Sequence, residues 1–313
     1  MIVALETGAD VVAVVPTLGS NLERLRNCLE SIQQSNFDGR LAVIVVWNDP
    51  RRPVLDLGQV TVLEPGMNLG FPIALNSARK LITALYLWIV QDDQTVEVGC
   101  LQILRDRMQK PDRPAIVRPV VIDAAGRIPA TSCGGILRES GAMNEPYPAT
   151  DIAPDEVDHD VRLDWVTLSG ALVRCEVWDE VGGMDPMFFP LQWSDIDLGY
   201  RMTKIGSSVV LEPQAKVTHQ RFGSTPTLFR HFLSERNQSY FLEKHRVGAP
   251  SDSKTTVETP DVIELIAREA SLLLLDFASY AEKEMHQLHN SPMMRLTRPL
   301  RSLVARVRGL RQR

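Results

Sequence analysis

Two adjacent carboxylates, Asp92 and Asp93, directly follow a short apolar run, LYLWIV, and a single Gln. A run of this length suits a buried strand and is too short for a membrane span. Open α/β sheets bind their ligands at the edge where parallel strands end. Two neighbouring carboxylates repel one another, and a divalent cation that bridges to phosphates would relieve that repulsion. The pair therefore suggests a metal and phosphate site, and the alternative is a polar turn after a strand.

A second pair of carboxylates, Asp195 and Asp197, opens a segment with helical periodicity, SDIDLGYRMTKIG. A carboxylate at a helix start in a semi-enclosed cleft can remove a proton from a hydroxyl group. Asp197 stands four residues before Arg201, so we expect these two side chains to pair on one helix face. The alternative is that both acids only cap the helix and favour its dipole.

Alternating strand-like and helix-like segments predict the elements that position these acids. Strands are expected at 10–17, 41–49, 60–65 and 85–93, and helices at 21–35 and 72–84. Ser20 or Asn21 is available to cap the first helix, and Pro72 suits the first turn of the second. Strands separated by helices of this length indicate a parallel, doubly wound sheet with its site at the strand ends.

The second half of the chain is less regular. Residues 111–163 are rich in Pro, Gly and acids, and we interpret them as an irregular insertion with a few strands. A strand followed by a short helix is expected at 163–183, and a helix capped by Ser194 at 194–206. A final strand pair is expected at 209–220, followed by a mainly helical region.

The bulk composition is that of an ordinary globular protein, with 44% apolar and 23% charged residues and a net charge of -5. This charge gives no indication of a nucleic acid partner. The four scattered cysteines indicate reduced thiols in a cytoplasmic protein. No secretory signal is evident, and the late segment SLLLLDFASYA is interrupted by Asp276, which favours a helix face over a membrane span.

Seven short blocks, in the same order along the chain, resemble the family 2 glycosyltransferases, which have the GT-A fold. They are VVAVVPT…LERLRNCLESI, VVWNDP, NLGFPIALN, WIVQDDQT, SGALVRCEVWDEVGGMDPMFF, SDIDLGYRMTKIG and VTHQRFGS. Each block is degenerate alone, but seven in family order are specific. The NLGF block and the late His–Ser block look most like bacterial rhamnosyltransferase-type enzymes that use a nucleotide sugar.

The resemblance implies an α/β fold of the GT-A, Rossmann-like type, with a mostly parallel sheet flanked by helices. The catalytic domain would span residues 1–225, with a nucleotide-sugar-binding half at about 10–110 and an acceptor half at 111–225. A helical C-terminal extension would follow at 226–313.

The resemblance also implies a metal and a donor site. Asp93 would bind Mn²⁺ or Mg²⁺, with His219 as a second ligand to the metal or the diphosphate. The remaining donor contacts would be Pro16, Thr17, Asn48, Asp49, Asn68, Gly70 and Asp92. The family usually has an acid where Asn48 stands, so Asp49 is an alternate base contact and the base identity stays open between dTDP and UDP sugars.

On the acceptor side, the resemblance makes Asp195 the general base. Gly170 would permit close approach of the acceptor, and Trp193 could stack on a sugar face, although core packing is the ordinary role of Trp. The family often has Glu where Ser194 stands, so the acceptor contacts at this position are in doubt.

These assignments predict an inverting glycosyltransferase that moves a sugar, with rhamnose as the first candidate, to a saccharide or lipid-linked hydroxyl in cell-surface polysaccharide synthesis. In-line attack by the activated hydroxyl, with no protein nucleophile, would invert the anomeric centre. Two alternatives stay open: a sugar-phosphate nucleotidyltransferase, and a degenerate member that serves as a saccharide-binding or assembly subunit.

The last twenty residues, MRLTRPLRSLVARVRGLRQR, contain seven arginines and no acid. Leu296, Leu300, Leu303 and Val307 recur at helical spacing, and a basic amphipathic helix suits an anionic membrane surface. Peripheral attachment to the inner face of the plasma membrane would bring the enzyme to lipid-linked acceptors. The alternative is a helix that packs on the catalytic domain or on a partner chain, and a homo-oligomer is compatible with it.

Overall fold

The computed structural model describes residues 8–51, 56–122, 163–219 and 225–247, together with isolated positions between 126 and 161 and between 270 and 286. The chain divides into two compact units, Met1–Thr255 and Thr256–Arg313. The predicted basic tail lies outside the described residues. Among the helices that the structure describes, none is both long enough and apolar enough to cross a membrane.

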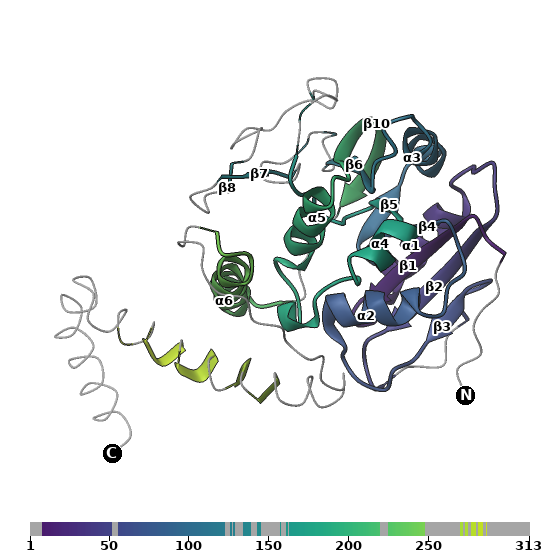
Figure 1. Ribbon diagram of the computed structural model, residues 1–313. Coiled ribbons are helices and arrows are strands. Elements are labelled where there is room, and N and C mark those ends of the chain that lie inside the picture. The colour runs from purple at the N-terminus through teal and green to yellow at the C-terminus, as the bar shows by residue number, and fades with distance from the viewer. Residues whose placement is uncertain are drawn as a thin grey trace, which may run out of the picture. The chain divides into compact units, whose positions relative to one another are not determined.

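An eight-stranded sheet forms the centre of the first unit, in the order β3-β2-β1-β4-β9-β6-β10-β5 (Figure 1). Its strands are β1 (Val11–Thr17), β2 (Leu41–Trp47), β3 (Thr61–Leu63), β4 (Tyr86–Ile89), β5 (Gln94–Val96), β6 (Ile116–Ile122), β9 (Leu172–Arg174) and β10 (Val209–His219). The first four strands are parallel to one another, as predicted. β6 and β10 form a second parallel pair, while β9 and β5 run antiparallel to their neighbours.

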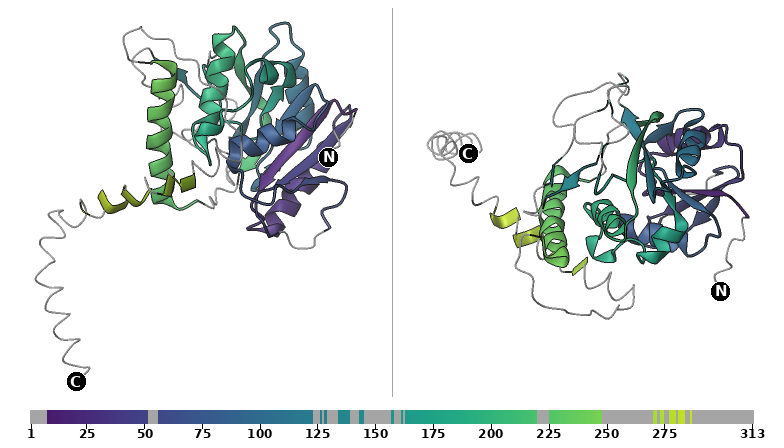
Figure 2. Two further views of the ribbon diagram at one scale, coloured as in Figure 1. Left: turned by 60° about the horizontal axis from the view of Figure 1, so that its bottom comes forward. Right: turned by 45° about the horizontal axis from the view of Figure 1, so that its top comes forward.

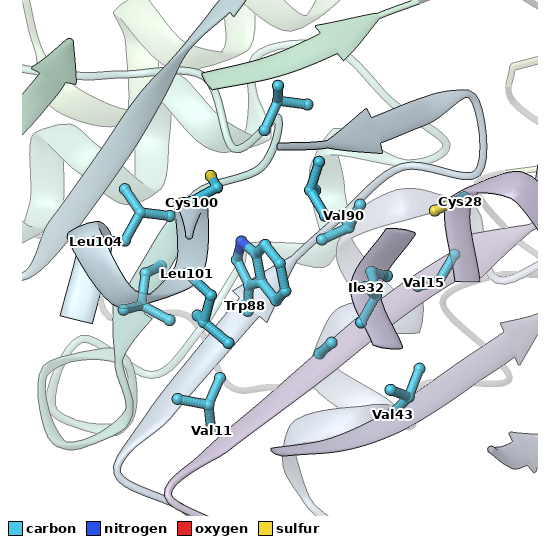
Figure 3. Close-up of a cluster of buried hydrophobic side chains, with 14 of the residues drawn as sticks. Val11, Val15, Cys28, Ile32, Val43, Trp88, Val90, Cys100, Leu101 and Leu104 are labelled. Atoms are coloured by element: carbon cyan, nitrogen blue, oxygen red, sulfur yellow. The ribbon is translucent and has the colours of Figure 1, made fainter. Parts of the chain in front are cut away.

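Two helices, α1 (Leu22–Gln33) and α3 (Cys100–Met108), cover one face of this sheet. α1 buries Leu25, Leu29 and Ile32, which recur at the predicted helical spacing, and Asn21 Oδ1 accepts a hydrogen bond from the Arg24 N–H as its N-cap. The Trp88 indole lies at the centre of the contact between helices and strands (Figure 3). Full burial of each large apolar side chain here contributes roughly 1.5–3 kcal/mol.

The other face carries α2 (Gly70–Arg79) and α4 (Cys175–Glu180), as Figure 1 shows. The chain then passes through the short 3-10 helix η2 (Pro186–Phe188) into α5 (Ser194–Lys204), and α6 (Thr227–His245) packs beside α5. Ser194 is the first residue of α5 and not its N-cap: the cap position is Trp193, which makes no side-chain capping bond. A small pair of strands, β7 (Ile136–Leu137) and β8 (Met143–Asn144), lies apart from the main sheet.

Two expectations for the second half were wrong. The segment that contains β6 is a fully buried strand inside the main sheet, not part of an irregular insertion, because its apolar residues pair with both β9 and β10. The predicted strand pair at 209–220 is one strand, β10, whose register shifts between Glu212 and Lys216. Such a bulge breaks the alternation that a sequence pattern depends on.

Candidate functional site

The carboxyl ends of β1 and β4 meet at Asp92. The Thr17 Oγ1 hydroxyl donates a hydrogen bond of 2.5 Å to Asp92 Oδ2 and accepts one of 2.9 Å from the Gly19 N–H. Burial raises the pKa of Asp92 above its usual range, and the charge of Asp93 adds to this, while the bond from Thr17 opposes it. Thr17 itself is buried, so its hydroxyl serves to fix the carboxylate at the sheet edge.

Asp93 lies beside His219, as the predicted pairing of the two requires. His219 Nε2 is 3.0 Å from Asp93 Oδ2, and both side chains are partly exposed. The antiparallel pairing of β5 with β10, in which His219 stands opposite Gln94, brings these distant parts of the chain together. The sequence did not predict β5, yet this short strand creates the contact.

Hydrogen bonds at Gln91 and Gln94 support the turn that carries the two acids. The Gln91 N–H donates to Gln94 Oε1 at 2.8 Å, and the Gln94 N–H donates to the Gln91 carbonyl at 3.1 Å. Cys28 Sγ donates to the same carbonyl at 3.3 Å. Burial raises the pKa of the Cys28 thiol, so this group is an inert support and not a nucleophile. Cys28, Cys100 and Cys175 are free and buried.

Asp93 and His219, the residues predicted to bind a metal, are chemically suited to a divalent cation. Among the described residues, no group of three or more His, Cys, Asp or Glu side chains gathers around one point. Mg²⁺ and similar ions at nucleotide sites commonly take one or two protein ligands and complete their shell with phosphate oxygens and water. Asp93 and His219 supply an oxygen and a nitrogen at one place, which is sufficient for a cation of that kind.

Asn48 has a structural role that the sequence did not indicate. Its Nδ2 donates to the Gly70 carbonyl at 3.2 Å, and its Oδ1 accepts from the Leu69 N–H at 3.4 Å. The side chain is buried, so its amide holds the loop after β3 and is engaged there instead of with a base. Asp49, the alternate contact, is partly exposed, and its Oδ1 accepts from the Arg51 N–H at 2.7 Å. Pro16 is partly exposed in β1.

Gly70 permits a close backbone contact with the loop that leads to Asp195. Asn68 is exposed, and its Oδ1 accepts a 2.8 Å hydrogen bond from the Gly70 N–H. Gly70 has φ +64°, and a Cβ there would lie 2.6 Å from the Pro190 carbonyl oxygen. The Phe71 N–H donates to that same carbonyl at 2.7 Å. The start of α2, where Asn68 and Gly70 are predicted to contact the donor, is therefore partly covered by protein.

Replacement of Gly70 by a residue with a side chain should lower the free energy of unfolding. Gly70→Ala is expected to destabilise the protein by about 1–3 kcal/mol more than Gly66→Ala. Both glycines have positive φ, +64° and +76°, but a Cβ at Gly66 meets nothing within 4 Å. The difference in urea-unfolding free energy between the two variants isolates the clash with Pro190. Equal losses would show that the loop yields without strain.

Asp195 lies beside the segment that leads into β9. Burial raises the pKa of Asp195, while the hydrogen bond from the Ile196 N–H and the positive charge of Arg118 oppose that shift. Arg118 is 1% exposed, and its guanidinium donates to Thr167 Oγ1 at 2.8 Å and to the Pro119 carbonyl at 3.0 Å. A carboxylate whose pKa is raised toward neutrality is better suited to accept a proton.

Two predicted acceptor contacts have other neighbours. The space beside the α-carbon of Gly170 is filled by Val217 and Pro119, and the Gly170 carbonyl accepts from Trp88 Nε1 at 2.9 Å. The close approach at Gly170 is thus made by protein instead of by an acceptor. Trp193 is buried against Phe241, with ring centroids 5.4 Å apart, so core packing occupies its ring. Ser194 is buried as well.

Asp197 is the centre of a buried network of charges. Arg201 Nε lies 2.8 Å from its Oδ2, which confirms the predicted pair, while Lys244 Nζ and His245 Nε2 each lie 2.7 Å from its Oδ1. Arg201 also donates at 2.6 Å to the carbonyls of Val181 and Gly183. Asp197 therefore joins α5, α6 and the turn after α4, two residues from Asp195.

This network should make the free energy of unfolding depend on pH. Burial alone would raise the pKa of Asp197, but the bond from His245 and the charges of Arg201 and Lys244 lower it to about 2. A lowered pKa stabilises the fold above the unfolded value, 3.8, and that stabilisation disappears as pH falls through about 2. The shift corresponds to about 2 kcal/mol.

Unfolding free energies measured in urea between pH 6 and pH 2.5 test this expectation. The decline should be shallower in Asp197→Asn than in the unchanged protein. Asp112→Asn is the matched control, since the pKa of Asp112 is also lowered, by a hydrogen bond from Arg107, but at a half-exposed site. An identical decline in all three proteins would contradict the role of Asp197.

Several residues that build this site were not singled out from the sequence. The signal for Arg118 is a lone charge inside the apolar run AIVRPVVID, where an unpaired cation would be costly. Asn237, Lys244 and His245 carry no such signal, because they lie on a polar helix far along the chain. Their importance follows only from what they contact.

Comparisons with known proteins relate the chain as a whole to one family. The family model described as "Glycosyltransferase like family 2" matches residues 9–240. Two curated relatives, from Mycobacterium tuberculosis strains CDC 1551 / Oshkosh and ATCC 25618 / H37Rv, are both named N-acetylglucosaminyl-diphospho-decaprenol L-rhamnosyltransferase. Each is 26% identical over 240 residues, which cover 69% of this chain and 76% of the relative.

Solved structures share the fold. GalNAc-T7 with UDP, GalNAc and Mn²⁺ superposes with a TM-score of 0.53 at 14% identity, covering 91% of this chain and 58% of that one. The mannosyltransferase PcManGT from Pyrobaculum calidifontis, in complex with GDP-Man and Mn²⁺, gives 0.50 at 14% identity, covering 97% and 81%. At these identities the likeness concerns the fold alone.

Proposed function

Because the chain belongs to the glycosyltransferase-like family 2 and is a GT-A glycosyltransferase, we propose that it transfers a sugar, with rhamnose as the first candidate, from a nucleoside diphosphate to a lipid-linked acceptor. The observation that carries this proposal is the meeting of Asp93 with His219 at 3.0 Å, beside the Thr17–Asp92 bond. The curated relatives named as rhamnosyltransferases on a decaprenyl diphosphate acceptor support both the sugar and the acceptor class.

The donor site would lie at the carboxyl ends of β1, β2 and β4. Asp92 would contact the ribose or the sugar, with its orientation fixed by Thr17. Asp49 is the better candidate for the base, because the amide of Asn48 is engaged with Gly70 and Leu69. Pro16 and the exposed Asn68 would complete the donor contacts, and a dTDP or UDP sugar fits such a set.

Asp93 and His219 would hold Mn²⁺ or Mg²⁺. A bound divalent cation supplies Lewis acidity that stabilises negative charge on a departing diphosphate. Two structural relatives contain Mn²⁺, which is consistent with this choice. The residues of this chain then have two tasks: to bind the diphosphate through that pair and to keep Asp92 from drifting away from the sugar.

Asp195 would act as the general base. It accepts the proton of the acceptor hydroxyl as that oxygen attacks the anomeric carbon of the donor sugar, and the bond from that carbon to the diphosphate breaks. With no side chain of this chain forming a covalent sugar adduct, one displacement inverts the anomeric centre. The positive charge of Arg118 favours the ionised form of Asp195, so the carboxylate stays available as a base.

A lipid-linked acceptor would place the enzyme at the inner face of the plasma membrane. The seven arginines of the last twenty residues would attract anionic headgroups, at roughly 1 kcal/mol for each charge near the surface. This attraction suits a cytoplasmic enzyme of cell-wall polysaccharide synthesis, which must reach an acceptor anchored in the bilayer.

A direct assay tests the function. The full chain, Mn²⁺, dTDP-rhamnose and N-acetylglucosaminyl-diphospho-decaprenol are incubated, and the lipid product is analysed by mass spectrometry for one added deoxyhexose. A thermal-shift screen of dTDP and UDP sugars, with and without Mn²⁺, identifies the donor in parallel. Transfer of rhamnose supports the proposal. A Mn²⁺-dependent shift with another nucleotide sugar, and no product with dTDP-rhamnose, would reject rhamnose as the sugar.

A further inference from the structure

The segment 185–193, here called the approach loop, brings the chain to the first turn of α5 and so to Asp195. It contains two non-glycine residues with positive φ, Gln192 at 75° and Trp193 at 67°. Each such residue costs roughly 1–2 kcal/mol unless its surroundings hold it in place. The backbone that delivers Asp195 therefore depends on contacts from outside the loop.

Helix α6 supplies those contacts along its length. Asn237 Nδ2 donates to the carbonyls of Leu191 and Gln192, at 2.9 Å each, and its side chain is completely buried. Trp193 Nε1 donates to Ser234 Oγ at 3.2 Å. The Arg236 guanidinium donates to the Met187 carbonyl at 3.1 Å and to Asn237 Oδ1 at 2.7 Å.

The C-terminal end of α6 contacts the first residue of the approach loop and Asp197, which follows the loop in α5. Lys244 Nζ lies 2.6 Å from Asp185 Oδ2 and 2.7 Å from Asp197 Oδ1. The Tyr240 hydroxyl donates to Asp185 Oδ2 at 3.0 Å. One helix thus contacts the approach loop from its first residue to its last, as well as Asp197 beyond it, and Figure 2 shows α6 standing beside α5.

We propose that α6 is the element that positions Asp195, and that Asn237 is its principal positioning residue. Asn237 holds two consecutive carbonyls with one nitrogen, at the two peptides that precede the turn into α5. This inference rests on the proposed function, in which Asp195 is the general base. A displacement of a catalytic group by 1 Å can cost about 100-fold in rate, so loss of this clamp should reduce the chemical step.

Asn237→Leu tests the proposal, since Leu keeps the branched shape of the side chain and removes both hydrogen bonds to the approach loop. With dTDP-rhamnose and the decaprenyl-linked acceptor in Mn²⁺, kcat should fall by about 10- to 100-fold while KM for the donor stays within twofold. Calorimetric binding of dTDP with Mn²⁺ should be unchanged. Asn237→Ser, whose hydroxyl can retain one bond directly or through water, should recover part of kcat and serves if the Leu variant does not fold.

Leu233→Ala is the control for general destabilisation. Leu233 is fully buried in the same helix, and its side chain cannot hydrogen-bond the approach loop. The assay is run well below the melting points of Leu233→Ala and Asn237→Leu. Even with a loss of Tm equal to that of Asn237→Leu, the Leu233→Ala variant should keep kcat within threefold of the unchanged enzyme. If Leu233→Ala loses as much kcat as Asn237→Leu, α6 only stabilises the fold and the proposal is overturned.

A double variant separates this inference from the proposed function. If Asn237 acts through Asp195, then Asp195→Asn combined with Asn237→Leu should be about as slow as Asp195→Asn alone, because the effects are not additive. Multiplied losses would overturn the positioning role. Normal turnover of Asp195→Asn itself would overturn the base assignment, whereas a slow Asp195→Asn beside a normal Asn237→Leu would overturn the positioning role only.

Discussion

The Asp195→Asn enzyme is expected to bind its nucleotide donor with unchanged affinity and to transfer sugar about 100- to 10,000-fold more slowly. Asn preserves the shape of the side chain and can still accept the hydrogen bond that the Ile196 N–H gives to Asp195 Oδ1. The amide cannot take up a proton, so only the chemical step is affected. Steady-state kinetics for turnover and calorimetry with dTDP and Mn²⁺ measure the two effects separately.

The control for this variant is Asp56→Asn, at an exposed turn where the side chain accepts from the Gly58 N–H. It removes one charge from the protein and should leave both turnover and binding as they were. The pH dependence of kcat adds a second criterion. Burial raises the pKa of Asp195, so the acid limb of the profile should lie above the ordinary range of an aspartate. Normal turnover in Asp195→Asn would refute its role as base.

The second large effect is expected at Asp93. In Asp93→Ala the increase in dTDP affinity on addition of Mn²⁺ should disappear, a loss of about 100-fold or more. Removing a residue that only hydrogen-bonds a metal ligand typically weakens metal binding by about 10- to 100-fold. Asp93 is assigned as a direct ligand, so its removal should cost at least as much. Removal of its carboxylate also leaves His219 without its 3.0 Å neighbour.

Calorimetric titrations of dTDP, with Mn²⁺ and with EDTA, measure this effect. The control is Asp106→Ala, which removes an exposed carboxylate from α3, away from the strand ends, and should retain the metal dependence. His219→Ala should weaken the metal-dependent binding without removing the carboxylate ligand. If Asp93→Ala still binds dTDP more tightly with Mn²⁺, the cation is held elsewhere.

The part of the fold that the sequence predicted best is the part built from local patterns. β1, β2 and β4 are apolar runs that each end in polar residues, and this is why the acids could be placed at the sheet edge in advance. The helical spacing in α1 and α5 was equally clear. β6 was expected only as one of a few strands in an irregular insertion, because Arg118 and Pro119 interrupt its apolar run, although both are accommodated inside the main sheet.

Site residues could be predicted from the sequence only where the residue type has few structural roles that would explain it equally well. Paired aspartates at a strand end point to charge chemistry, and Asp92 and Asp93 lie where expected. Asn48 and Trp193 serve equally well as ligand contacts or as internal supports, and the choice between these depends on partners that are remote in the sequence. The role of Asn237 depends on a folded contact with Leu191 and Gln192, which no spacing rule encodes.

The contact between Phe71 and Pro190 has a consequence for the construction of chimeric enzymes. It joins the loop before α2, which is proposed to contact the donor, to the loop that leads to Asp195. The joint consists of a backbone N–H and a backbone carbonyl, so it does not depend on the identity of either side chain. At this contact the side chains can therefore differ between relatives, and a chimeric enzyme keeps the joint if a glycine stays at the position of Gly70. An interchange that places a larger residue there would push these two loops apart.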